Sequence, residues 1–114
     1  MPQQDAVREL NHPAREEIRL EAVLHALSDR TRLHIAHKLD TLGREVACSV
    51  IDLAVSKSTT THHYRVLREA GVIRQTYRGT SKLNGLRRAD LDERFPGLLD
   101  AVLSAVAECP DRDE

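Results

Sequence analysis

The chain has 114 residues and a mass of 12.8 kDa, the size of one small domain, and its 40% hydrophobic content is typical of a globular protein. The net charge of −1 taken alone argues against a nucleic-acid-binding protein. No stretch of eighteen apolar residues and no signal-peptide pattern is present, so we expect a cytoplasmic protein with no membrane partner.

The N-terminal part predicts a polar tail followed by a helix. Residues 1–13 are expected to be partly disordered or to add a turn of helix. Pro13 suits a first helical position, with Asn11 or His12 as the cap, and the helix should run to about Leu27. Its apolar residues cover more than one side, which indicates a second packing partner in addition to the core.

Two further helices and a tight turn are predicted next. A helix capped by Ser28 or Asp29 should end near Gly43, with Arg32 among its outward side chains. The segment REVACSVIDLAVS, residues 44–56, predicts a short third helix. A fourth helix, capped by Ser56, should end at Gly71.

The C-terminal part predicts a β-hairpin and a closing helix. The hairpin should span about residues 72–77 and 81–86, turning at Gly79. Pro96 then starts an apolar last helix. The expected fold is mostly α with a small β-hairpin, in the order of four helices, two strands and one helix. We expect a winged helix-turn-helix domain at residues 14–108, a C-terminal tail at 109–114, and residues 44–56 and 57–70 as the helix-turn-helix pair.

Charge is distributed unevenly along the chain. Residues 57–88 carry eight Lys and Arg side chains against the single acid Glu69, a net charge of +7 that leaves −8 for the remainder. Such a local basic field is typical of a surface that binds a polyanion, although a solvated basic face would look the same.

The fourth predicted helix has the side chains that a DNA-reading helix requires. In a helix-turn-helix motif the second helix lies in the major groove, where short polar groups reach base edges. The expected base-reading residues are Ser58, Thr59, Thr61 and His62. The expected phosphate ligands beside them are Lys57, Arg65 and Arg68. At the tip of the hairpin, Tyr77, Arg78, Thr80 and Lys82 are expected to contact the backbone or a minor groove.

Three segments, LHALSDRTRLHIAHKL, VSKSTTTHHYRVLREAGVI and YRGTSKLNGLRRADLDERFPGLLDAVL, resemble the ArsR/SmtB family of bacterial winged-helix repressors over roughly residues 15–107. The resemblance implies a homodimer joined through its first and last helices, bound to a palindromic operator in double-stranded DNA and released by a small effector of unknown identity. Dimer contacts are expected at Ile18, Leu20, Val23, Leu98, Leu99, Val102, Leu103 and Val106.

Metal-sensing members of that family place a Cys-x-Cys in the third helix or Asp and His ligands on the last helix, and neither pattern occurs here. We therefore expect no metal and no cofactor. Adjacent helical residues point about 100° apart, so His62 and His63 should not chelate one ion. We expect His62 to face DNA and His63 to pack at a helix interface.

Several alternatives remain open at the level of sequence. Cys48 and Cys109 could form a redox pair in a thiol-sensing repressor, or could be a buried and an incidental thiol. The domain could also be a winged-helix module that binds an acidic protein partner. An enzyme is not expected, because no glycine-rich phosphate loop, H-E-x-x-H or G-x-S-x-G pattern is present.

Overall fold

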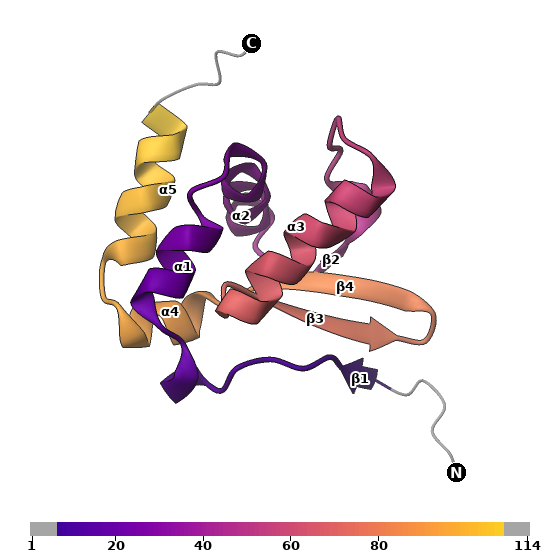
Figure 1. Ribbon diagram of the computed structural model, residues 1–114, viewed down its shortest axis with the longest axis horizontal. Coiled ribbons are helices and arrows are strands. Elements are labelled where there is room, and N and C mark those ends of the chain that lie inside the picture. Colours follow the sequence, from indigo (N-terminus) through magenta and orange to yellow (C-terminus); the bar gives the residue numbers. More distant parts are fainter. Residues whose placement is uncertain (1–6, 109–114) are drawn as a thin grey trace.

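The computed structural model describes residues 7–108 and places five α-helices around a four-stranded antiparallel sheet (Figure 1). The strand order in the sheet is β1-β3-β4-β2. The elements are β1 (Val7–Glu9), the 3-10 helix η1 (Arg15–Glu17), α1 (Leu20–Ala26), α2 (Arg30–Leu42), β2 (Val46–Ala47), the 3-10 helix η2 (Cys48–Val50), α3 (Lys57–Ala70), β3 (Ile73–Arg78), β4 (Ser81–Leu86), α4 (Arg88–Arg94) and α5 (Leu98–Glu108).

This mixed architecture is consistent with a winged helix-turn-helix, but the predicted order of elements is wrong. Strands lie at both edges of the hairpin, and the segment predicted as a third helix is not an α-helix. The core is mainly aliphatic, with Ile35, Leu39, Leu67 and Ile73 almost fully buried, and it also contains the buried Tyr64. Within residues 7–108, none of the helices combines the length and apolar character needed to span a bilayer.

The N-terminal segment, expected to be disordered or helical, forms a strand where it is described. β1 pairs antiparallel with β3, placing Arg8 opposite Tyr77 and Glu9 opposite Thr76. The unpaired edge of β3 offers a complete row of backbone hydrogen-bonding groups, and polar side chains do not prevent pairing there. Glu9 adds an ion pair with Arg74 at 3.2 Å.

The first predicted helix is interrupted at Ile18 and Arg19, both of which have extended backbone. Ile18 is fully buried and packs against Gly71, where an added Cβ would come within 2.7 Å of the Ile18 side chain. The guanidinium of Arg94 donates to the carbonyl of Ile18. These contacts divide the predicted helix into η1 and the shorter α1, because tertiary packing outweighs helix propensity here.

The predicted third helix is replaced by β2, η2 and a loop. The segment contains Val46, Val50, Ile51 and Val55, whose β-branched side chains lower helix propensity, and a helix this short is marginal without a packed face. Val46 and Ala47 instead pair with Asn84 and Leu83 of β4.

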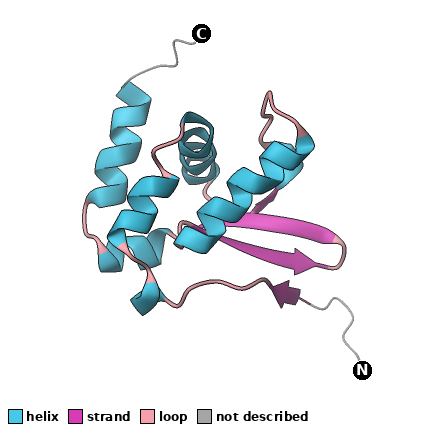
Figure 2. Cartoon of the chain, viewed as in Figure 1, coloured by secondary structure: helices cyan, strands magenta, loops and turns pink. Residues whose placement is uncertain are grey.

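Most other predicted boundaries agree with the structure, but the last helix begins at Leu98 and not at Pro96. Asp29 caps α2 and Gly43 ends it, while Ser56 caps α3 and Gly71 ends it in a left-handed conformation. The hairpin is confirmed as β3 and β4, with Arg78 opposite Ser81 and a positive φ at Gly79, and Figure 2 shows it extending beyond the helices. Between the hairpin and the last helix lies the helix α4, which was not predicted.

Candidate nucleic-acid interface

Helix α3 has one exposed polar face and one buried face. Its exposed side chains include Lys57, Ser58, Thr59, Thr61, His62 and Arg65. Its buried face carries His63, Tyr64, Leu67 and Ala70. The 3.6-residue period therefore predicted the outward direction of these six side chains correctly.

The N-terminus of α3 holds a cluster of hydroxyl groups around its cap. The Oγ of Ser56 accepts from the backbone N–H of Thr59 at 3.1 Å and donates to the Thr59 hydroxyl at 2.9 Å. The Ser58 hydroxyl lies 3.3 Å from the same Oγ. Each hydroxyl keeps donor or acceptor capacity for an outside partner, and the cap holds the cluster in place.

His63 faces inward and joins α3 to α2, as predicted for a histidine at a helix interface. Its Nδ1 lies 3.2 Å from Nη1 of Arg32 and 3.8 Å from Oδ2 of Asp29. Arg32, which was predicted to point outward, is buried and also donates to the carbonyl of Ala26 at 2.7 Å. Desolvation alone would raise the pKa of Asp29, but the N–H and charge of Arg32 lower it overall.

Arg68 is half-buried, which corrects the expectation that it lies free on the outer face. Its Nη1 donates to Oε1 of Gln75 in β3 at 2.9 Å. Gln75 in turn donates to Asn84 in β4 at 2.7 Å, and Asn84 donates to Sγ of Cys48 at 3.2 Å. This buried chain of hydrogen bonds fixes the reading helix against the two strands of the wing.

The wing is the hairpin of β3 and β4, widened by β1, and cations gather near its tip. The Arg8 guanidinium lies 4.8 Å from the centroid of the Tyr77 ring, and Nζ of Lys82 lies 5.7 Å from it. Arg78 and Thr80 are exposed beside them. The ring holds both cations by stacking, and neither has a carboxylate partner among residues 7–108, so their charge remains available to an anion.

The basic field read from the sequence separates into two groups in space. Arg74, Arg87 and Arg88 lie at the base of the wing, where each forms ion pairs. The side chains of Arg65 and Arg78 have no hydrogen-bond or ion-pair partner among residues 7–108. The unpaired positive charge is therefore concentrated on α3 and the wing tip, which Figure 1 shows on the side of the molecule away from α5.

No protein-family model matches the chain. It is similar to the uncharacterized HTH-type transcriptional regulator YceK of Bacillus subtilis (strain 168), with 30% identity over 82 residues. That match covers 70% of this chain and 82% of the relative. The chain belongs to the HTH-type transcriptional regulators. It is a DNA-binding regulator.

One cation on the exposed surface of the regulator was not predicted from the sequence. Arg8 joins the wing only because β1 pairs with β3, and a three-residue polar strand has no periodic signal. Arg32 was likewise missed as a buried residue. Its position three residues after the Asp29 cap, close to a histidine-bearing helix, carries no signal in a single sequence.

The predicted dimer residues fall into two groups in the regulator. Ile18, Val23, Leu99 and Leu103 are buried within the single chain, so their assignment as interface residues is corrected to core. The remaining four stay accessible: Leu20 is exposed, and Leu98, Val102 and Val106 are half-buried.

Cys48 is a half-buried free thiol, and Cys109 lies outside the described residues. The hydroxyl of Tyr64 is buried without a partner within residues 7–108, and burial, with Cys48 nearby, raises its pKa above the ordinary value of 10.0. Among residues 7–108, no group of three or more His, Cys, Asp and Glu side chains is arranged to hold a metal ion.

Proposed function

We propose that this regulator is a sequence-specific, homodimeric repressor of the ArsR type that an effector releases from its operator. The observation that carries the proposal is the exposed outer face of α3 together with the exposed wing tip. This surface presents short polar groups between unpaired cations, which is the arrangement required for base contacts flanked by phosphate contacts.

Individual roles follow from exposure and position. Thr61 and His62 lie on the outer face of α3, and no side chain among residues 7–108 occupies their polar groups. The capped hydroxyls of Ser58 and Thr59 precede them. These four residues read bases. Phosphates are bound by Lys57, Arg65, Arg78 and Lys82, with Tyr77 and Thr80 completing the wing contact and Arg8 added by β1. Arg68 positions α3 on the wing through Gln75.

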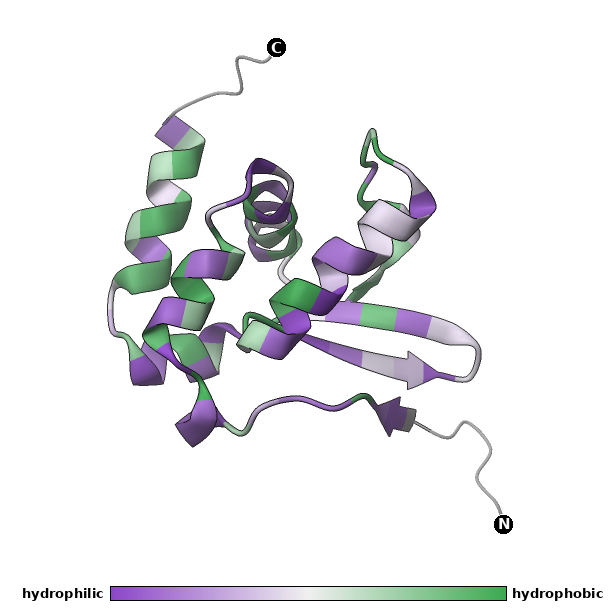
Figure 3. Ribbon diagram, in the orientation of Figure 1, coloured by the Kyte–Doolittle hydropathy of each residue, from purple (hydrophilic) through white to green (hydrophobic). Residues whose placement is uncertain are grey.

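The dimer is supported by an uncovered apolar stripe on α5. Leu98, Val102 and Val106 are half-buried, and Ala101 and Ala105 between them are exposed. Figure 3 shows the hydrophobic colouring along this helix. Leu20 and Leu24 of α1 are 42% and 46% exposed. Apolar positions at this helical spacing that the chain itself leaves uncovered are typical of a helix that packs against another subunit.

A two-fold dimer would place two copies of α3 in successive major grooves, about 34 to 36 Å apart, on a palindromic operator. The match of LSDRTRL and HHYRVLREAGVI to the characteristic segments of the ArsR/SmtB family supports this subtype. Release then requires an effector that binds one geometry of the dimer better than the other.

DNase I footprinting on the DNA around the regulator's own gene tests the proposal. We expect one protected palindromic site, competed away by the same duplex but not by a scrambled duplex of equal length. The rival reading, a winged-helix module that binds an acidic protein, predicts weak binding that falls steeply with salt and shows no preferred site. That result would refute the proposed function.

A further inference from the structure

A cavity of about 520 Å³ lies at the base of the wing, away from the proposed DNA surface. It is lined by the end of α2 and the following turn, by the roots of β3 and β4, and by the start of α4. A volume in this range is typical of pockets that hold a small organic ligand. Leu39, Leu86 and Ala89 supply its apolar lining.

One wall of the cavity carries excess positive charge. The side chain of Arg87 is only 4% exposed; its Nε donates to Oδ2 of Asp90 at 2.9 Å and its Nη1 to the carbonyl of Pro13. Nη2 of Arg74 approaches the same Asp90 oxygen at 3.5 Å, and Arg15 lies 3.9 Å from the other oxygen. Three guanidinium groups therefore share Asp90. Among residues 7–108, the other acid paired with these arginines is Glu9, which contacts Arg74.

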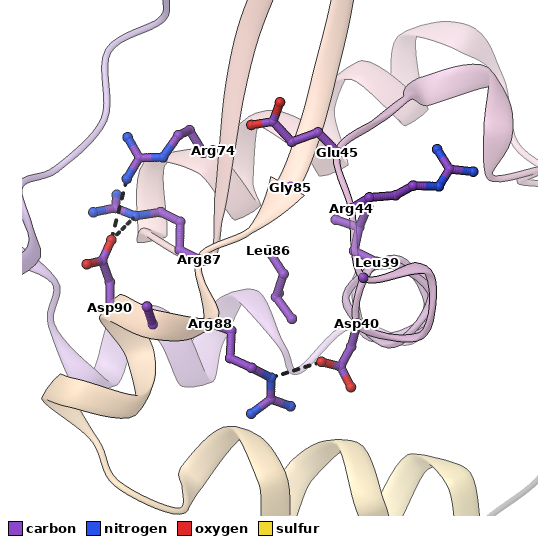
Figure 4. A pocket seen from close by; sticks show the side chains of 12 residues that line it. Leu39, Asp40, Arg44, Glu45, Arg74, Gly85, Leu86, Arg87, Arg88 and Asp90 are labelled. Carbon is purple, nitrogen blue, oxygen red and sulfur yellow. Dashed lines mark hydrogen bonds and ion pairs between the residues drawn. The ribbon is translucent and has the colours of Figure 1, made fainter.

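The opposite wall holds charges of both signs, because Arg44 lines it beside Asp40 and Glu45. Arg88 is surrounded by three carboxylates, with Asp40 at 2.9 Å, Asp100 at 2.8 Å and Asp92 at 3.4 Å. In Figure 4 this ion pair of Arg88 and Asp40 lies across the cavity from Arg74 and Arg87, and Leu86 stands between the two sides. The two charged walls are thus separated by an apolar floor.

Glu45 adds a free carboxylate at the rim of the cavity. It has no hydrogen-bond or ion-pair partner among residues 7–108. Its side chain lies across β4 at Gly85, where an added Cβ would come within 2.9 Å of the Glu45 Cγ. The missing side chain at position 85 therefore allows this carboxylate to face the mouth of the cavity (Figure 4).

We propose that this cavity binds a small zwitterion of the amino-acid class, with its carboxylate on Arg74 and Arg87 and its ammonium group towards Asp40 and Glu45. The guanidinium nitrogens not used by Asp90, Glu9 and Pro13 donate to the carboxylate. The short aliphatic part of the ligand lies on Leu86 and Ala89.

A ligand in this position would connect the base of the wing to α2, and α2 contacts the reading helix through Arg32 and His63. Ligand occupancy would therefore change the orientation of the wing relative to α3. This regulatory consequence rests on the proposed function, whereas binding to the cavity does not.

The test is an NMR titration of the DNA-free, full-length protein with 4-aminobutyrate, 5-aminovalerate and 6-aminohexanoate. We expect backbone amide shifts centred on residues 85–90 and, for the best-fitting length, affinity about fivefold tighter than for hexanoate or hexylamine, which each lack one charge. Equal affinity for hexanoate, or shifts spread over the surface, would overturn the zwitterion site. No binding by any of the three amino acids would also overturn it.

Matched variants locate the site. Arg74→Gln should weaken the best zwitterion several-fold, whereas Arg78→Gln on the same strand should not. Glu45→Gln should weaken the zwitterion but leave hexanoate unchanged, and Glu69→Gln is its control. Ala89→Phe fills the cavity from the exposed side of α4 without removing a charge, and should abolish binding while the thermal unfolding midpoint is retained. Unaltered binding by Ala89→Phe would exclude the cavity.

Operator binding is measured separately, with and without the amino acid that binds most tightly in the titration. A change in operator affinity in the wild type but not in Ala89→Phe supports the regulatory consequence. Binding in the cavity with unchanged operator affinity would refute regulation and leave the site itself standing. Absence of any specific operator would refute the proposed function without affecting the NMR result.

Discussion

Nη1 of Arg32 lies 3.2 Å from Nδ1 of His63, and both side chains are buried between α2 and α3. A guanidinium can only donate, so Nδ1 of His63 is the acceptor in this hydrogen bond. The same Arg32 donates from Nε to the carbonyl of Ala26 at the end of α1. One buried cation therefore fixes the reading helix relative to the two helices that support it.

We predict that Arg32→Met lowers the free energy of unfolding by about 2 to 3 kcal/mol, because charged hydrogen bonds are lost while the apolar stem is kept. Urea denaturation measures the change. Lys38→Met, an exposed change on the same helix, is the control and should stay within about 0.5 kcal/mol of the wild type. An equal effect of both changes would show that the Arg32 contact contributes nothing specific.

The sequence predicted the elements with periodic patterns and defined caps. α3 is the clearest case, because Ser56 and Gly71 mark its ends and its apolar residues recur at three and four positions. The hairpin was equally accessible from Gly79 and its β-rich flanks. These signals are local, so a single sequence contains them.

The elements that were missed depend on contacts distant in sequence. Val7–Glu9 becomes a strand because β3 presents an open edge, and Ile18 leaves the helix because it packs on Gly71. Val46 pairs with Asn84, 38 positions away, instead of continuing a helix. For the candidate site, the direction of the side chains on α3 was predictable from the sequence. The hydrogen bond between Arg68 and Gln75 and the stacking of Arg8 on Tyr77 were not, because both join residues of different elements.

Arg65→Ala and Thr61→Ala should affect DNA binding in different ways. Arg65 is an unpaired cation, so its loss should weaken binding to all sequences alike and reduce the salt slope by about one unit. Loss of the Thr61 hydroxyl should relax discrimination at one base pair by roughly 1 to 3 kcal/mol. Fluorescence anisotropy with a set of single-base operator variants at several salt concentrations measures both. Identical behaviour of the two variants would contradict the assigned roles.

Arg8→Ala tests whether β1 belongs to the DNA surface. Arg8 stacks on Tyr77 at the wing and keeps its charge unpaired by any carboxylate within residues 7–108. Its removal should reduce the salt slope of operator binding by about one unit and leave base preference intact. Arg19→Ala is the control, because Arg19 is an exposed arginine beside α1 that pairs with Glu21. A wild-type salt slope in Arg8→Ala would exclude β1 from the interface.

Leu24→Glu tests the proposed dimer. Leu24 is 46% exposed on α1, so a carboxylate there is tolerated by the folded monomer but not in an apolar interface between subunits. We expect sedimentation velocity to show a monomer and operator affinity to fall more than tenfold. Val50→Glu, a change at a residue 48% exposed but far from α1 and α5 in the sequence, should remain dimeric. A dimeric Leu24→Glu protein would place the interface elsewhere.

The N-terminal arm, residues 7–14, packs against β3, and this packing should depend on pH through His12. Its side chain is 5% exposed, and its Nε2 accepts from the backbone N–H of Gln75 at 2.8 Å. Burial, followed by the charge of Arg74, lowers the pKa of His12 below its ordinary value of 6.5. Between the lowered pKa of the folded state and 6.5, the His12 imidazole binds a proton more readily in the unfolded chain than in the folded one. The contribution of neutral His12 to folding stability is therefore complete above pH 6.5 and is lost as the pH falls towards the folded pKa.

We therefore predict that the wild type is more stable than His12→Gln near neutral pH and that this difference shrinks from about pH 8 to about pH 5. Comparing the two proteins cancels the other histidines, which titrate in both. Thermal unfolding gives the difference, and amide exchange of Gln75 reports the arm directly, because its protection should fall with acid in the wild type. A stability difference that stays constant over this range would show that His12 does not titrate in the fold.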